Sequence, residues 1–152
     1  MRHLAFALLL AVPLFSHAQE TMPYFNVDGK GLWVEGYDPV AYSVLKKAVK
    51  GNAAISTVYK GATFRFAIAA NRDLFLKDPE RYLPMYGGWC AYALGANNEK
   101  VEVDPETFKI IDGKVFLFYN AYFNNTLTTW NKNEASLHRD ADRHWAAFVH
   151  NK

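Results

Sequence analysis

The chemistry-bearing residues of this chain begin with a single cysteine. Cys90 is the only one in the sequence; it follows the pair Gly87-Gly88, and we expect it in the first turn of a short helix. Exposed amides and the dipole at a helix start favour a thiolate, the form of cysteine that binds metals and attacks electrophiles. The alternative is a small buried side chain packed among rings, because free cysteine is among the most buried residue types.

A histidine could complete a site with this thiol. Of the three histidines in the C-terminal half, only His144 lies near the apolar stripe of its expected helix, about 40° from Phe148 at about 100° per residue. Cys90 and His144 could bind one metal ion, copper or another transition metal, or act as nucleophile and base with Asp140 or Asp142 as orienting group. The alternative is a histidine hydrogen-bonded at the edge of the core. Sequence spacing does not decide between them.

Aromatic residues in the same part of the chain suggest a pocket for a small ligand. We expect Tyr37, Tyr86, Trp89 and Tyr92 to line it, since aromatic cages bind cations and small molecules. The alternative is that the rings pack in the core with their hydroxyls bonded to loop carbonyls. No pair of carboxylates is placed for general acid–base catalysis, so no catalytic residue is assigned.

The start of the chain is typical of a removable export signal. It has a basic residue at Arg2, an apolar run from Leu4 to Phe15, and the small-x-small sequence Ser16-His17-Ala18. We expect cleavage after residue 18, with residues 19–152 forming one domain in the periplasm or outside the cell. The apolar run is shorter than the roughly 20 residues of a bilayer span, so stable membrane insertion is not expected.

Charge excludes one class of function. Removing Arg2 from the 17 Lys and Arg residues leaves 16 against 15 acidic residues, a formal charge of +1 with neutral histidines. The densest basic cluster is only Lys46-Lys47 with Lys50, whereas nucleic-acid-binding domains carry a basic patch or stripe. We therefore expect no nucleic-acid partner. With one cysteine, the chain has no internal disulfide.

The hydrophobic pattern predicts an α+β fold. Two hairpins are expected, Ile55–Tyr59 with Thr63–Ala67 around Lys60-Gly61, and Lys109–Ile111 with Val115–Tyr119 around Asp112-Gly113. A further short strand is expected at Leu32–Glu35. Together they make a small antiparallel sheet packed with short helices and a C-terminal helical segment, an arrangement of the α+β class.

Helices are expected between and after the hairpins. Asp38 caps a helix that Pro39 begins. Other helical segments are expected at 71–77, at 79–82 and at a helix or turn start at Asp104-Pro105-Glu106. The C-terminal helical segment carries two apolar stripes, which are Phe123, Leu127 and Trp130, and Leu137, Ala141, Trp145 and Phe148.

Several of these motifs together resemble the YHS domain. The resemblance rests on Gly36–Tyr42, Tyr59–Ala67, Asn71–Tyr82 and the Tyr-Gly-Gly-aromatic-Cys-Ala-Tyr element at Tyr86–Tyr92. It extends to about Trp145 and is closest to the exported branch of the family. The contiguous Tyr-His-Ser triplet is absent from this chain.

Related domains have metal sites built from cysteines, and the resemblance places those cysteines at Ala41, Ala67 and Asn71. An alanine methyl has no lone pair, and a neutral amide is a poor donor to Cu(I) or Zn(II). Cys90 is then the only thiol candidate. The resemblance favours an exported, non-enzymatic binding or accessory protein with a small ligand or metal near Cys90. The alternatives are a thiol-dependent enzyme using Cys90 with His144, and a domain that only binds protein partners.

Overall fold

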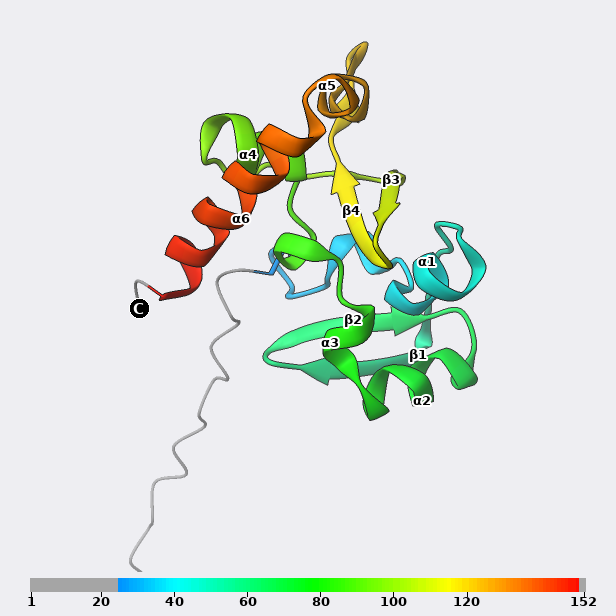
Figure 1. Ribbon diagram of the computed structural model, residues 1–152. Coiled ribbons are helices and arrows are strands. Elements are labelled where there is room, and N and C mark those ends of the chain that lie inside the picture. The colour runs from blue at the N-terminus through cyan, green and yellow to red at the C-terminus, as the bar shows by residue number, and fades with distance from the viewer. Residues whose placement is uncertain (1–24, 151–152) are drawn as a thin grey trace, which may run out of the picture.

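The computed structural model describes residues 25–150, in which short helices alternate with three two-stranded antiparallel sheets (Figure 1). This is the predicted α+β class. The elements in chain order are η1 Val34–Gly36, α1 Pro39–Leu45, β1 Asn52–Tyr59, β2 Ala62–Phe66, α2 Ala69–Lys77, α3 Pro79–Tyr82, η2 Met85–Gly88, α4 Ala91–Asn97, β3 Asp104–Ile111, β4 Lys114–Phe118, β5 Asn120–Ala121, β6 Asn124–Asn125, α5 Thr126–Lys132 and α6 Glu134–His150. The expected signal at 1–18 lies outside the described residues. Between residues 25 and 150, no helix has the length and apolar character of a membrane span.

Both predicted hairpins are confirmed. Tyr59 pairs with Ala62 across the first turn, and Ile111 pairs with Lys114 across the second. The two central residues of each turn have positive φ, with Asp112 at 49° and Gly113 at 76° in the second. This conformation follows the right-handed twist of the strands and is the reason that Asp-Gly signals a hairpin.

The strand predicted at Leu32–Glu35 is wrong. Leu32 and Trp33 each form only an isolated bridge, and the chain then turns through the 3₁₀ helix η1. Glu35 has a φ of 51° and Gly36 a φ of 76°, so the backbone leaves the extended region there. Apolar spacing alone does not detect such a bend.

Two predictions about helices are also wrong, the first in its helical alternative only. Asp104 does not start a helix but opens β3, where its carboxylate accepts a hydrogen bond from Glu106 N at 3.0 Å. Phe123 does not belong to a helical stripe: it lies in the β5–β6 turn and is fully exposed. The helix α5 begins only at Thr126, because Asn125 accepts from Leu127 N as its N-cap.

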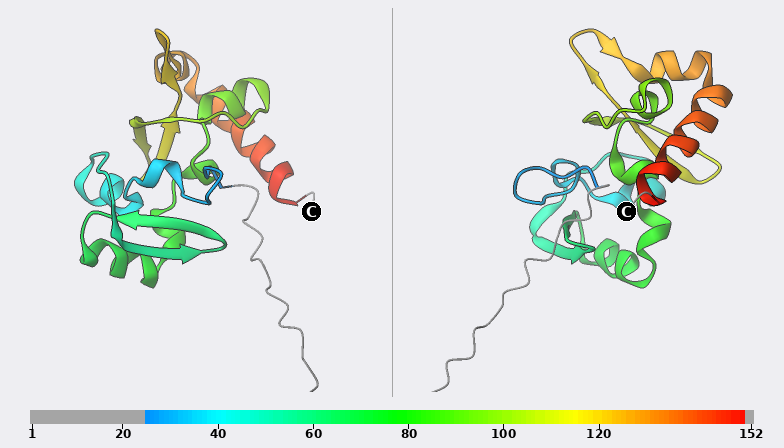
Figure 2. Two further views of the ribbon diagram at one scale, coloured as in Figure 1. Left: turned by 180° about the vertical axis from the view of Figure 1, so that it is seen from behind. Right: turned by 90° about the vertical axis from the view of Figure 1, so that its left-hand side faces the viewer.

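Two hydrophobic clusters share one strand. The first lies around β1, β2 and α2, and the second lies under α4, α5 and α6 (Figures 1 and 2). Strand β4 runs between them, because successive side chains of a strand point to opposite faces. Val115 and Leu117 enter the first cluster, whereas Phe116 and Phe118 enter the second.

Helices α4 and α6 pack closely. A Cβ on Gly95 would lie 2.5 Å from the carbonyl oxygen of Leu137, so this crossing requires glycine. The second predicted stripe is confirmed, with Ala141 buried and Leu137, Trp145 and Phe148 packed against the second cluster. This contact holds α6 beside the β3–β4 hairpin and η2.

Candidate functional site

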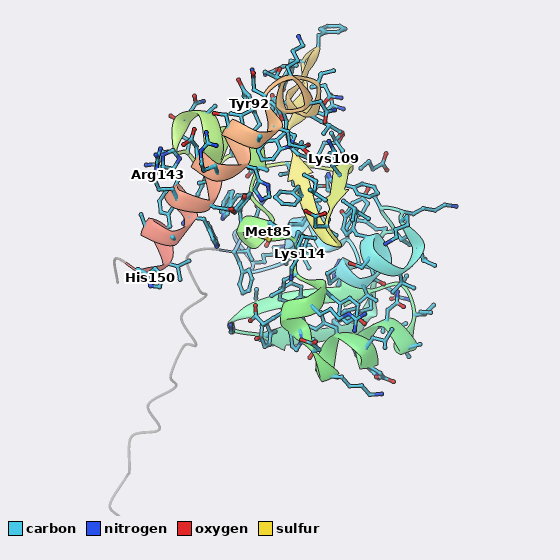
Figure 3. All side chains as sticks on the ribbon, in the orientation of Figure 1. Met85, Tyr92, Lys109, Lys114, Arg143 and His150 are labelled. Carbon is cyan, nitrogen blue, oxygen red and sulfur yellow. The ribbon has the colours of Figure 1, made fainter. Side chains whose placement is uncertain are left out.

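A cleft of about 410 Å³ lies where the half of the molecule built on the first hydrophobic cluster meets the half built on the second. Its lining combines apolar side chains with two lysines and one glutamate. In Figure 3, Met85 and Lys114 lie next to each other at this junction, where the β3–β4 hairpin reaches η2. The lining residues are Phe25, Lys60, Glu80, Leu83, Pro84, Met85, Tyr86, Gly87, Lys114, Trp145 and Val149.

The turn that carries Tyr86 into this cleft is held by contacts with the segment that contains Asn26, Trp33 and Val34. Tyr86 has a φ of 59°, in the left-handed region that non-glycine residues rarely occupy. The carbonyl of the next residue, Gly87, accepts hydrogen bonds from Trp33 Nε1 and Asn26 N, both at 3.0 Å. A Cβ on Gly88 would lie 2.7 Å from Val34 Cγ2, so the glycine allows the turn to pack directly on the first cluster.

The hydroxyl of Tyr86 connects η2 to α6. It donates to Asp142 Oδ1 at 2.8 Å, and Asp142 Oδ2 lies 3.6 Å from His138 Nε2. Burial, followed by the hydrogen bond to Asp142, raises the pKa of Tyr86 far above its ordinary value. At neutral pH the phenol is neutral, and its single hydrogen is donated to Asp142.

Charge at the rim of the cleft is unevenly balanced. Lys60 Nζ donates to Glu80 Oε1 at 2.7 Å, and Tyr59 OH donates to the same oxygen at 2.8 Å. The bond from Lys60 holds the pKa of Glu80 below its ordinary value. Lys114 is exposed and contributes a further positive charge. The cleft therefore suits a small apolar molecule with an anionic or hydrogen-bond-accepting group.

Cys90 is buried, as the structural alternative for it expected. It is the N-cap residue of α4, and its sulfur accepts a hydrogen bond from Tyr119 N at 3.3 Å. The sulfur also lies 3.5 Å from Thr126 Oγ1, which donates its own hydrogen to the carbonyl of Tyr119. This leaves the thiol hydrogen to bond Thr126. Both hydrogen-bonding capacities of the thiol are thus used inside the protein.

His144 is hydrogen-bonded near the middle of α4. Its Nδ1 lies 2.7 Å from the carbonyl oxygen of Leu94, and its Nε2 lies 3.4 Å from Arg143 Nη2. Leu94 is four positions beyond Cys90 along the helix, a rise of roughly 6 Å. No recorded hydrogen bond joins His144 to Cys90. Across residues 25–150, no three His, Cys, Asp or Glu side chains are grouped to hold a metal ion.

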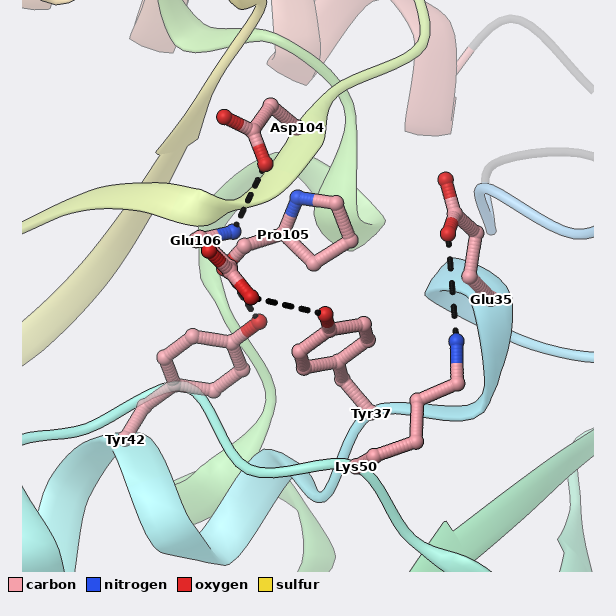
Figure 4. Close-up of polar contacts among 7 residues, drawn as sticks. All are labelled: Glu35, Tyr37, Tyr42, Lys50, Asp104, Pro105 and Glu106. Carbon is pink, nitrogen blue, oxygen red and sulfur yellow. Dashed lines mark hydrogen bonds and ion pairs between the residues drawn. The ribbon is translucent and has the colours of Figure 1, made fainter.

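Tyr37 lies in a different cleft, of about 440 Å³, shown in part in Figure 4. Its hydroxyl donates to Glu106 Oε1 at 3.3 Å, and Lys50 Nζ lies 4.6 Å from its ring centre. Burial and the nearby carboxylate of Glu106 raise the pKa of Tyr37. Beside it, Tyr42 is buried and donates to the carbonyl of Pro105 at 2.8 Å.

The four aromatic residues expected at one pocket are therefore distributed. Tyr86 and Tyr37 line two separate clefts. Tyr92 is partly buried and packs against the second hydrophobic cluster, in the upper half of Figure 3, and Trp89 is partly buried directly after η2. The structure thus does not gather these rings at one cleft, and a ligand at any of them stays a prediction.

The three positions at which the resemblance places cysteines gather around one buried carboxylate. Asp38 Oδ1 accepts from Val40 N and Ala41 N, at 2.9 and 3.3 Å. Asp38 Oδ2 accepts from Ala67 N at 2.8 Å and from Asn71 Nδ2 at 2.7 Å. A side chain with four hydrogen-bond donors around it has no lone pair turned toward a cation. These residues do not fit the metal site of the related domains.

Sequence reasoning missed most residues of the Tyr86 cleft. Met85, Lys114 and Trp145 come from η2, β4 and α6, and no spacing rule relates them. Of the cleft residues, the sequence predicts only Tyr86 as a ligand contact, from its place in the Tyr-Gly-Gly element. The sequence offers Asp142 as a partner of His144, whereas its carboxylate bonds Tyr86 and faces His138.

Comparison of the chain with protein-family models, with curated protein sequences and with solved structures found no match.

Proposed function

We propose that the chain is an exported, non-enzymatic binding protein of the YHS type, which holds a small apolar ligand with an anionic group in the cleft beside Tyr86. The observation that carries the ligand site is the cleft itself, with apolar walls and the cationic Lys114 at its rim. Its volume of about 410 Å³ falls in the range of small-molecule pockets, roughly 300–1,000 Å³.

The polar groups of the cleft are suited to binding. Tyr86 is neutral at neutral pH and donates its single hydrogen to Asp142, so it offers a ligand neither a free proton nor a base. The pair that a thiol enzyme would need, Cys90 and His144, is engaged in separate hydrogen bonds. These contacts favour a binding role over thiol chemistry.

Asp38 supports the YHS part of the proposal. The spatial meeting of Ala41, Ala67 and Asn71 is what a shared ancestral site would require, although their sequence separation does not predict it. In this chain hydrogen bonds to Asp38 replace metal ligation at those positions. Cys90 is then the only thiol of the chain that could ligate a soft metal ion.

The ligand site is tested with 8-anilinonaphthalene-1-sulfonate, which combines fused rings with a sulfonate. We expect saturable binding to the folded protein, measured by fluorescence. Lys114→Glu should weaken it by about tenfold, since reversing one charge at the rim costs on the order of 1.4 kcal/mol. Trp145→Ala should weaken it through loss of an apolar wall.

Lys47→Glu is the matched control for the charge reversal, because Lys47 is exposed on the loop after α1 and does not line the cleft. Near-UV circular dichroism of each variant establishes that it is folded, since the dye also binds partly unfolded chains. Equal affinity of wild type, Lys114→Glu and Trp145→Ala would contradict the proposed site.

The prediction of a metal site at Cys90 is tested separately. A Cu(I) competition titration compares wild type with Cys90→Ser. Tight binding of one equivalent that the variant loses would establish a Cys90 site. Equal weak binding by both proteins would eliminate it, and would leave the ligand proposal unaffected.

A further inference from the structure

The β5–β6 hairpin ends in two fully exposed aromatic side chains. Asn120 pairs with Asn125 and Ala121 with Asn124, so the connecting loop is the dipeptide Tyr122-Phe123. The side chains of this dipeptide are the two most exposed among the large hydrophobic residues of the described chain, at 91 % and 112 % relative accessibility.

The backbone of this turn is unfavourable for the residues that occupy it. Tyr122 has a φ of 51° and Phe123 a φ of 63°, the pattern of a type I′ turn. Such turns strongly prefer Asn-Gly, because both central residues must adopt positive φ. Two aromatic residues here gain neither core packing nor a relaxed backbone. Strain of this kind in a native structure is a reason to look for a function.

The sequence on either side of the tip is polar or apolar and carries no charge. From Val115 to Asn131 the sequence contains no Lys, Arg, Asp or Glu. The hairpin stands at the end of the molecule opposite the β1–β2 sheet, beside α5 (Figures 1 and 2). Its strands carry asparagines at 120, 124 and 125 behind the two rings.

We propose that the Tyr122-Phe123 tip inserts into the interface of a lipid bilayer with zwitterionic headgroups. Aromatic side chains concentrate at the membrane–water interface, and the exposed Asn124 beside them can bond headgroups and water. Since residues 115–131 include no Lys or Arg, we expect no contribution from attraction of the hairpin to anionic lipid. The contact is peripheral and reversible, and it does not depend on the ligand cleft.

A protein partner fits the tip less well. Two rings on one turn offer much less than the roughly 1,200 Å² that specific stable protein interfaces bury. A protein would also have to supply a matched socket for two side chains that project freely. A bilayer surrounds projecting rings without such a socket, because its interface is fluid.

The test is co-sedimentation of the protein with phosphatidylcholine vesicles. Wild type and variants are all purified from cells that export them, so that each has the same N-terminus. The decisive variant is Tyr122→Asn with Phe123→Gly, which creates the preferred type I′ sequence and should raise stability toward urea. We expect its partition coefficient to fall about tenfold or more, since both rings lose their transfer from water. Loss of binding in a more stable protein is not attributable to unfolding.

Leu76→Asn is the matched control, because Leu76 is a 55 % exposed hydrophobe on α2, far from the tip. It should partition like the wild type. Phe123→Trp adds a positional readout, since brominated lipid should quench its fluorescence beyond the quenching of the wild-type protein.

Three results would overturn the proposal. One is a wild-type protein that does not sediment with phosphatidylcholine vesicles at millimolar lipid. Another is equal partitioning of the wild type and the double variant. The third is a protein that binds only vesicles containing phosphatidylglycerol and loses this binding in high salt. That result would assign membrane binding to basic residues elsewhere on the surface.

Discussion

Asp38 Oδ2 accepts a hydrogen bond from Asn71 Nδ2 at 2.7 Å, and this contact joins the N-cap of α1 to the first turn of α2. The two residues are 33 positions apart, and both are buried. The same carboxylate also binds Ala67 N after β2. One side chain thus fixes two helices and the end of a strand.

Replacing Asp38 by Asn should destabilise the protein by about 3 kcal/mol, because the amide nitrogen would face donors in a buried site. Urea unfolding followed by circular dichroism measures this loss. Asp28→Asn is the control: Lys30 N and Leu32 N both bond Asp28 Oδ1 alone, so an Asn oxygen can keep both. Similar losses in the two variants would contradict the central role of Asp38.

Alkaline pH should destabilise the protein through its buried phenols. The pKa of Tyr42 and that of Tyr86 are raised, mainly by burial, so above about pH 10 these groups ionise in the unfolded chain first. The unfolded state then binds fewer protons, and stability falls with pH by up to about 1.4 kcal/mol per unit for each group.

Urea midpoints between pH 9 and 11 test this dependence. Tyr86→Phe should show a shallower decline than the wild type, besides losing about 1 kcal/mol at neutral pH with the bond to Asp142. Tyr122→Phe should keep the wild-type slope, since Tyr122 is exposed. If Tyr86→Phe loses stability with pH as steeply as the wild type, the phenol of Tyr86 has the same pKa in the folded and unfolded states, which contradicts the prediction.

The thiol of Cys90 should not react in the folded protein. Its sulfur is buried and hydrogen-bonded, so iodoacetamide can reach it only when the structure opens. Labelling followed by mass spectrometry should give a rate that rises with urea in parallel with unfolding. Cys90→Ala should cost about 1–3 kcal/mol because it leaves Tyr119 N without its acceptor. Rapid labelling in native buffer would instead favour the thiol enzyme.

Gly95→Ala should separate α4 from α6. The added Cβ would meet Leu137 O at 2.5 Å, and relief requires a backbone shift that costs about 2 kcal/mol or more. Gly29→Ala is the control, because a Cβ there meets no atom within 4 Å. Urea unfolding should distinguish the two variants clearly, and equal stability would contradict the close helix crossing.

Export predicts a defined mature N-terminus. Mass spectrometry of the protein from exporting cells should find a chain that begins at Gln19, because cleavage is expected after Ala18. Ala18→Phe should block processing, since signal peptidases require a small residue there. A chain that retains Arg2 to Ala18 in the wild type would contradict the proposal of a cleaved signal.

Local signals in the sequence predicted much of the fold. Turns such as Asp112-Gly113 and the cap at Asp38-Pro39 depend on neighbouring residues only, so they were found. The bend at Glu35 was not found, because hydrogen bonds from distant segments hold the backbone around it, such as Trp33 N to Thr63 O. Phe123 is exposed in a turn although it is apolar, so a pattern that assumes apolar residues are buried predicts a helix there.

The candidate site was predictable only in part. Tyr86 belongs to a recognisable motif, but its partner Asp142 lies 56 positions away on α6. Lys114 reaches the cleft because β4 packs against η2, and Trp145 reaches it because its ring meets that of Tyr86. Such convergence is a property of tertiary packing, and residue spacing in one chain carries no record of it.

The two faces of β4 have a consequence for how the molecule comes apart. Because Val115 and Phe116 stabilise opposite clusters, freeing the strand from one cluster exposes apolar surface on the other as well. The halves then behave as a single cooperative unit despite three separate small sheets. The slowest-exchanging amides around β2 and α6 should open with one common free energy. Limited proteolysis should yield either intact protein or small peptides, with no stable half.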